Sequence, residues 1–204
     1  MGKRIAVVAS GRGSNFQAVI DAIAAGKINA TCVALITDNP EAYAIQRAQD
    51  AGIRSVIIDY RSFPSREGYE RALLSAMQQA DADLFVLAGY MRILGCSIVR
   101  AFPGKMVNIH PALLPSFPGL HAQRQALLHG VKIAGCTVHF VDESLDGGPI
   151  ILQDCVPVLG DDDEDSLAGR ILEKEHRCYP EAIRLFCEGR LQIEGRKVRI
   201  LSPE

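Results

Sequence analysis

The feature that most constrains this chain is an alternation of short apolar runs with helical patterns. Interpreted as strands and helices in turn, these segments lie at residues 4–10, 15–25, 31–37, 41–51, 53–59, 66–80 and 84–88. Repeated βα units of this kind favour an α/β fold with a mostly parallel sheet, because each helical crossover returns the chain to start the next strand in the same direction. The run LFVLAG lacks in–out alternation, as expected for a central strand covered on both faces.

The pattern changes after a strand predicted at residues 105–109. A Pro-rich loop and a short helix near 123–129 precede two apolar runs, AGCTVHFVD and PIILQDCVPV, joined by ESLDGG. These runs favour an antiparallel pair added to the sheet. A long helix is predicted at 163–187, and a hairpin near LQIEGRKVRIL closes the chain. The acidic run DDDED is interpreted as the cap of the long helix, with metal binding as the alternative.

Composition bounds the function classes. A chain of 204 residues can bury a substantial core as one domain, and a formal net charge of −2 gives no electrostatic footprint for nucleic acid. The apolar run near the N-terminus, before the glycines and arginine, is far shorter than the apolar region of a signal peptide or a membrane span. Six cysteines without a CxxC pair are interpreted as reduced thiols rather than zinc ligands. We therefore expect a cytoplasmic protein with no membrane partner and no metal.

A glycine-containing loop, SGRGSN, follows the first predicted strand. Gly13, Ser14 and Asn15 stand where a helix begins, and backbone N–H groups at a helix start can bind a phosphate. A dinucleotide fingerprint would need a third glycine where Phe16 stands, although Asp38 at the end of the second strand could be its ribose partner. A tight turn capped by Ser14 is the alternative without a ligand.

Polar side chains end the strand that enters the loop NIHPALLPSFPG. Ligands of parallel α/β sheets bind beyond the carboxyl ends of the strands, and Asn108 and His110, two positions apart, share a face there. The same spacing places Thr137 and His139 on one face of a later strand. Asp146 lies in the loop before two glycines, where a carboxylate can be held against an imidazole.

Asn108, His110 and Asp146 fit the needs of acyl transfer. The amide can donate to a developing oxyanion, the imidazole can supply charge or a proton, and the carboxylate can orient the imidazole. Neither a GxSxG elbow nor a Cys–His pattern supplies a nucleophile, so attack by a substrate amine fits better than an acyl-enzyme. In the alternative, Asn108 and Asp146 only close turns, and His110 is a core residue whose hydrogen bonds are made within the protein.

Two further function classes stay open from the residues alone. A nicotinamide-dependent oxidoreductase would use the glycine loop and Asp38, but Phe16 argues against it. A non-catalytic ligand-binding module would have no use for Asn108, His110 and Asp146 together.

Five stretches support a family resemblance: GRGSN, LAGYMRIL, NIHPALLPSFPG, GCTVHFVDESLDGGPIILQ and EHRCYPEAI. In this order, over nearly the whole chain, they resemble the folate-dependent formyltransferases. Motifs within the two longest stretches are shared by the wider family. The GxGSN loop and the compact length favour the phosphoribosylglycinamide formyltransferase branch, because the tRNA formyltransferases and the formyltetrahydrofolate hydrolases would need an added domain.

The resemblance implies transfer of a formyl group from 10-formyltetrahydrofolate to glycinamide ribonucleotide (GAR) in purine synthesis, without metal or ATP. It implies a single domain, 1–204, with a phosphate-binding half at 1–104 and a folate-binding and catalytic half at 105–204. These two small molecules are the expected partners, and the protein is expected to be a monomer or weak homodimer.

The resemblance also implies a role for each matching residue. The implied catalytic residues are Asn108, His110 and Asp146. The implied GAR ligands are Gly13, Ser14, Asn15 and Glu175, and His121 and His139 are implied to support the site. The implied folate contacts are Arg66, Met91, Arg92, Ile93, Leu94, Asn108, Val141, Asp142, Glu143, Ser144, Leu145 and Asp146.

Overall fold

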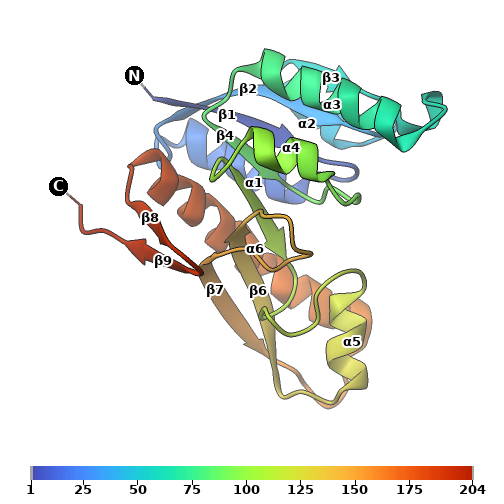
Figure 1. Ribbon diagram of the computed structural model, residues 1–204. Helices are drawn as coiled ribbons and strands as arrows, with labels where there is room; N and C mark the ends of the chain where they lie inside the picture. Colours follow the sequence, from blue (N-terminus) through green and yellow to red (C-terminus); the bar gives the residue numbers. More distant parts are fainter. Residues whose placement is uncertain (1, 204) are drawn as a thin grey trace. The chain divides into compact units, whose positions relative to one another are not determined.

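The chain divides into two compact units, Met1–Val107 and Asn108–Glu204, of which the computed structural model describes residues 2–203 (Figure 1). The fold class is the predicted one: a Rossmann-like, mostly parallel mixed sheet flanked by helices, with antiparallel strands in the C-terminal half. No helix in the described part of the chain is both long and apolar enough to cross a membrane.

The first unit is built from repeated βα units, as predicted. Its elements are β1 (Lys3–Val8), α1 (Ser14–Ala24), β2 (Ala30–Thr37), α2 (Ala44–Asp50), β3 (Ser55–Ile57), the 3₁₀ helix η1 (Tyr60–Ser62), α3 (Arg66–Ala80), β4 (Leu84–Leu87) and α4 (Cys96–Ala101). The strands follow the order β3-β2-β1-β4 and pair in parallel. Residues at the carboxyl ends of β1 and β2 therefore emerge at the same edge of the sheet.

The burial pattern explains these assignments. Every residue of β4 is buried, as predicted for a strand without alternation. In α3, Tyr69, Leu73 and Met77 recur every four residues and are buried, which is the stripe of a helix with one face in the core.

The second unit contains the rest of the predicted pattern. Its elements are β5 (Met106–His110), which begins at the end of the first unit, α5 (Ala122–Leu128), β6 (Ile133–Phe140), β7 (Ile150–Pro157), α6 (Glu164–Cys187), β8 (Leu191–Glu194) and β9 (Lys197–Ile200). The predicted antiparallel pair is β6 and β7, and the predicted terminal hairpin is β8 and β9. The helix α6 packs on β6 and β7 (Figure 1).

The acidic run caps α6 as predicted. Asp163 is the N-cap, its carboxylate accepts a hydrogen bond from the backbone N–H of Ser166 at 2.8 Å, and the Ser166 hydroxyl accepts from the Asp163 N–H at 3.1 Å. Glu164 and Asp165 occupy the first turn, where the helix dipole favours negative charge.

The connection between β6 and β7 depends on a close backbone approach at Gly148. The Phe140 N–H donates to the Pro149 carbonyl at 2.9 Å, which closes the ends of the connecting loop. A Cβ atom built on Gly148 would overlap the Phe140 carbonyl oxygen. Only glycine fits this position without a backbone shift.

We expect Gly148→Ala to lower the free energy of unfolding by about 1–3 kcal/mol, because the new methyl group forces the two strand ends apart. The matched control is Gly169→Ala in α6, where nothing lies within 4 Å of the added carbon. That change should raise the free energy of unfolding by about 0.5–1 kcal/mol, since glycine is costly inside a helix. Urea denaturation of both variants measures the difference, and equal stabilities would contradict the assignment.

Candidate active site

The second unit brings the predicted catalytic residues together. The Nδ1 atom of His110 lies 3.4 Å from Oδ2 of Asp146, and the Nε2 atom of His139 lies 3.8 Å from Oδ1 of the same carboxylate. The Nδ2 atom of Asn108 lies 3.2 Å from His139 Nε2. Asn108 and His110 come from β5, His139 from β6, and Asp146 from the following loop. Two imidazoles, an amide and a carboxylate thus form one cluster. Side chains that only close turns would not need to converge in this way.

His139 is held as a neutral ring. Burial lowers the pKa of its imidazole below the ordinary 6.5, although the Phe140 carbonyl and the Asp146 carboxylate act in the opposite direction. Its Nδ1 atom lies 2.9 Å from the Phe140 carbonyl oxygen and must carry the hydrogen, so Nε2 is an acceptor. The Asn108 amide donates one N–H to this acceptor, which fixes the amide orientation and leaves its second N–H for another partner.

Both ring nitrogens of His110 face an acceptor. Its Nε2 atom donates to the Phe117 carbonyl at 2.8 Å, and its Nδ1 atom faces Asp146. A protonated imidazole therefore has an acceptor on each side. Asp146 is fixed in turn, because its Oδ2 atom accepts the Gly119 N–H at 2.8 Å.

The Pro-rich loop after β5 is clamped by a buried threonine. The Thr137 hydroxyl donates to the Ala112 carbonyl at 2.7 Å and accepts from the Leu114 N–H at 3.0 Å. The Gln153 amide donates to Thr137 Oγ1 and to the Leu114 carbonyl, both at 2.9 Å. Since the hydroxyl uses one donor and two acceptor positions, its hydrogen-bonding capacity is filled.

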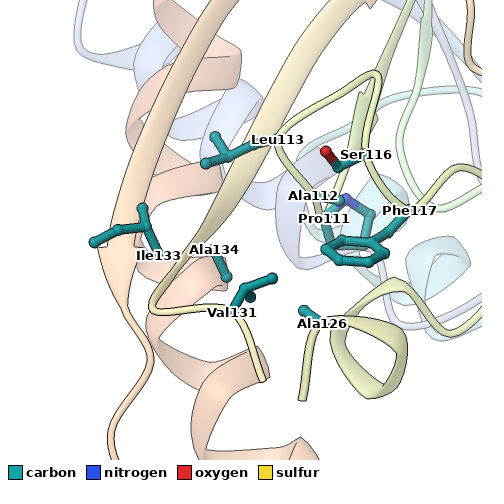
Figure 2. Close-up of a pocket in the computed structure, with 9 residues that line it drawn as sticks. All are labelled: Pro111, Ala112, Leu113, Ser116, Phe117, Ala126, Val131, Ile133 and Ala134. Carbon is teal, nitrogen blue, oxygen red and sulfur yellow. The ribbon is translucent and has the colours of Figure 1, made fainter. Parts of the chain in front are cut away.

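A small pocket of about 120 Å³ borders the same loop (Figure 2). Its walls are mostly apolar, with the ring of Phe117 on one side and Ala126 and Val131 opposite. They come from the Pro-rich loop, α5, the turn after α5 and the start of β6: Pro111, Ala112, Leu113, Ser116, Phe117, Ala126, Val131, Ile133 and Ala134. The four polar residues of the cluster do not line it. The pocket adjoins the cluster at Phe117, whose carbonyl faces His110 Nε2 at 2.8 Å.

In the first unit, the predicted phosphate loop forms the start of α1. Gly13 is the N-cap with φ +69°, and an added Cβ atom would lie 2.8 Å from the Cβ atom of Ala44. No side chain caps α1, so the alternative of a turn capped by Ser14 is not what the structure shows. Arg47 donates from Nε to the Arg12 carbonyl at 2.9 Å, which adds a cation beside the loop. Sequence reasoning did not single out Arg47.

The structure also brings the predicted folate-binding residues of the first unit together. Arg66 donates from Nη2 to the Ile93 carbonyl at 3.1 Å and from Nε to Glu70 at 2.7 Å. Asp38 does not stand free as a ribose partner, because it accepts a hydrogen bond from Arg92 Nε at 2.6 Å and its side chain is only 4% exposed. This pairing removes one of the features on which the oxidoreductase hypothesis depended.

The remaining predicted residues belong to the second unit. In the loop 141–146, Asp142 Oδ1 accepts from the Ser144 N–H at 2.9 Å, and the Leu145 side chain is exposed. Glu175 is buried on α6. His121 is the N-cap of α5, and its side chain is 72% exposed with Nδ1 4.0 Å from Glu164 Oε1. The supporting role of His121 stays a prediction.

Sequence reasoning missed the groups that orient the imidazoles. The carbonyl oxygens of Phe117 and Phe140 do this, and a backbone carbonyl leaves no side-chain signature in a sequence. Thr137 shares a strand face with His139, which was a usable signal, but its clamp on the loop became visible only in three dimensions. In residues 2–203, no three His, Cys, Asp or Glu side chains are grouped so as to hold a metal ion.

The family model described as "Formyl transferase" matches residues 3–183, and this chain belongs to that family. The phosphoribosylglycinamide formyltransferase of Escherichia coli K12 is 45% identical over 93% of this chain and 89% of that protein. The trifunctional purine biosynthetic protein adenosine-3 of Drosophila melanogaster is 50% identical over 99% of this chain, which spans only 14% of that protein. The crystal structure of glycinamide ribonucleotide transformylase 1 from Symbiobacterium toebii has a TM-score of 0.96 and 53% identity, covering 98% of this chain and 95% of that one.

We expect Thr137→Val to lower the free energy of unfolding by about 1–3 kcal/mol, because the buried Leu114 N–H and the Gln153 amide lose their acceptor. Thr137→Ser keeps the hydroxyl and is the matched control, with a smaller loss from the missing methyl group. Chemical denaturation of both variants checks the expectation. A valine variant as stable as the serine variant would rule out the hydroxyl clamp.

Stability should fall at acidic pH through His139. Because the folded state lowers the pKa of this ring, the unfolded chain binds a proton that the folded chain resists once the pH drops below roughly 6.5. The contribution of the uncharged His139 ring to the free energy of unfolding is therefore fully present above that pH and is lost as the pH falls below it. Urea denaturation at pH 7.5 and 5.5 should show a larger loss for the native chain than for His139→Gln, and identical pH slopes would contradict a neutral His139.

Proposed function

We propose that this chain transfers the formyl group of 10-formyltetrahydrofolate to the amine of GAR, giving formyl-GAR and tetrahydrofolate in de novo purine (IMP) biosynthesis. The observation that carries the proposal is the cluster of Asn108, His110 and Asp146, which is joined through His139 by contacts of 3.2–3.8 Å. Family membership supports the formyl chemistry, and the names of the similar proteins support GAR as the acceptor.

In the proposed mechanism, the GAR amine attacks the formyl carbon directly and the carbonyl oxygen becomes an oxyanion. The free N–H of Asn108 and the charge of a protonated His110 stabilise that oxyanion. The tetrahedral intermediate then collapses, the bond to the folate nitrogen breaks, and this nitrogen gains a proton while the attacking amine loses one. Asp146 stabilises the imidazolium and assists the proton transfer, directly or through water.

For GAR, we propose that the phosphate binds Gly13, Ser14 and Asn15 and that Glu175 holds the ribose or glycinamide end. The uncapped start of α1 and the nearby Arg47 support the phosphate assignment, since both favour an anion. For the folate, we propose binding by Arg66, by residues 91–94 and by residues 141–146. His121 and His139 support the site.

We further propose that residues 1–204 work as one formyltransferase domain that uses neither metal nor ATP and acts as a monomer or weak homodimer.

The deciding experiment measures tetrahydrofolate release from 10-formyltetrahydrofolate with and without GAR. We expect release only when GAR is present, and none from His110→Ala. Release without GAR would indicate a hydrolase instead. No release under either condition would favour the alternative that the chain is a non-catalytic ligand-binding module.

Asn108→Ala should slow formyl transfer about 10²–10³-fold in single-turnover assays, because one oxyanion donor is lost. The variant should still bind both substrates, since the amide acts on charge that develops in the transition state. A slowing of less than about tenfold would remove Asn108 from this role.

A further inference from the structure

Four consecutive residues at the carboxyl edge of the first unit are each held by a hydrogen bond from another part of that unit. The segment is Tyr90–Ile93, directly after β4 and Gly89. The four hydrogen bonds join Tyr90 Oη to Tyr69 Oη at 2.7 Å, Met91 N to Ser10 Oγ at 3.0 Å, Arg92 Nε to Asp38 Oδ2 at 2.6 Å, and Ile93 O to Arg66 Nη2 at 3.1 Å. A loop tied at every residue has little freedom to rearrange.

The shortest of these hydrogen bonds, from Arg92 to Asp38, involves a buried carboxylate. The Asp38 side chain is 4% exposed, and the Arg92 guanidinium is its ion-pair partner. The guanidinium carbon of Arg92 also lies 3.4 Å from the centre of the Tyr60 ring, so the cation is held between a carboxylate and an aromatic face. Tyr60 packs edge to face on Tyr69 with ring centres 5.0 Å apart, which fixes the aromatic face in turn.

Tyr69 and Tyr90 add a hydrogen bond between uncharged groups to the Arg92–Asp38 ion pair. Burial raises the pKa of Tyr69 to about 12 and also raises that of Tyr90, so both hydroxyls keep their protons at neutral pH. One hydroxyl therefore donates to the other. The side chains of Tyr90 and Arg92 are thus both engaged with the body of the unit.

The alternate side chains of the same segment are free of the core. Met91 is 69% exposed and Ile93 is 65% exposed. Large apolar side chains at this exposure cost free energy unless a ligand covers them. Rigid backbone beneath exposed apolar side chains is the arrangement of a pre-organised binding surface, because little ordering entropy is lost when a ligand arrives.

We propose that Asp38 is a positioning residue for the folate co-substrate. By holding Arg92 against Tyr60, its carboxylate keeps the backbone of Met91–Ile93 in the geometry that receives the folate. This inference rests on the proposed function, because it takes the segment 91–94 as part of the folate site. Asp38 itself touches neither substrate.

The test variant is Asp38→Asn, which keeps the size of the side chain and removes its charge. We expect the KM for 10-formyltetrahydrofolate to rise about tenfold, a change of about 1.4 kcal/mol in binding. The KM for GAR and kcat at saturating folate should stay within about twofold. Calorimetric titration with 10-formyltetrahydrofolate in the absence of GAR should show the same loss of affinity.

Tyr60 supplies a second, milder probe with a matched control. Tyr60→Leu removes the aromatic face and should raise the folate KM, whereas Tyr60→Phe keeps the face and should not. Because both side chains act on one guanidinium, the double variant Asp38→Asn/Tyr60→Leu should lose less folate affinity than the sum of the single variants. Full additivity would show that they do not act through Arg92.

The results separate this inference from the proposed function. If the native chain shows no GAR-dependent release of tetrahydrofolate, the proposed function fails. If the native chain is active but folded Asp38→Asn and Tyr60→Leu keep the native folate KM, the positioning role is wrong. A role in stability alone would lower the melting temperature and the active fraction, and hence the apparent kcat, without shifting the folate KM. That outcome would also overturn the proposal.

Discussion

The buried, uncharged imidazole of His139 is the constraint on which the candidate site depends. Its Nδ1–H is directed to the Phe140 carbonyl, so its Nε2 atom accepts from the Asn108 amide and sets the direction of that amide. The close approach of Gly148 borders the same carbonyl oxygen. A strand-end contact and the proposed oxyanion donor are thus parts of one arrangement, and a change at the glycine should reach the Asn108 amide through two hydrogen bonds.

The strand β6 holds the site at two points on one face. His139 orients Asn108, and Thr137, two residues earlier, clamps the Pro-rich loop through Ala112 and Leu114. That loop carries the Phe117 carbonyl that receives the His110 N–H. The side chains proposed as catalytic lie on β5 and in the loop after β6, but the groups that fix their orientation are a threonine hydroxyl and two backbone carbonyls.

The sequence predicted the order and type of the elements well and their ends less well. The helix α3 has the predicted bounds, 66–80, since its apolar stripe and its N-cap Ser65 are both local. The helix predicted at 41–51 begins only at Ala44, because Asn39 and Pro40 form a turn in which the Asn39 side chain accepts the Glu41 N–H at 3.0 Å. The strand predicted at 53–59 shortens to Ser55–Ile57, where β2 offers a partner.

The sequence by itself determined the α/β class, the antiparallel pair, the capped long helix and the residues proposed to carry the chemistry, because periodicity, capping and motif residues are local properties. Only the tertiary structure decided which tautomer His139 adopts and which carbonyl faces the Nε2 atom of His110. It also decided that the Asp38 carboxylate pairs with Arg92 and is not available to a ribose. These outcomes depend on burial and on contacts between residues distant in the chain, which no short stretch of sequence encodes.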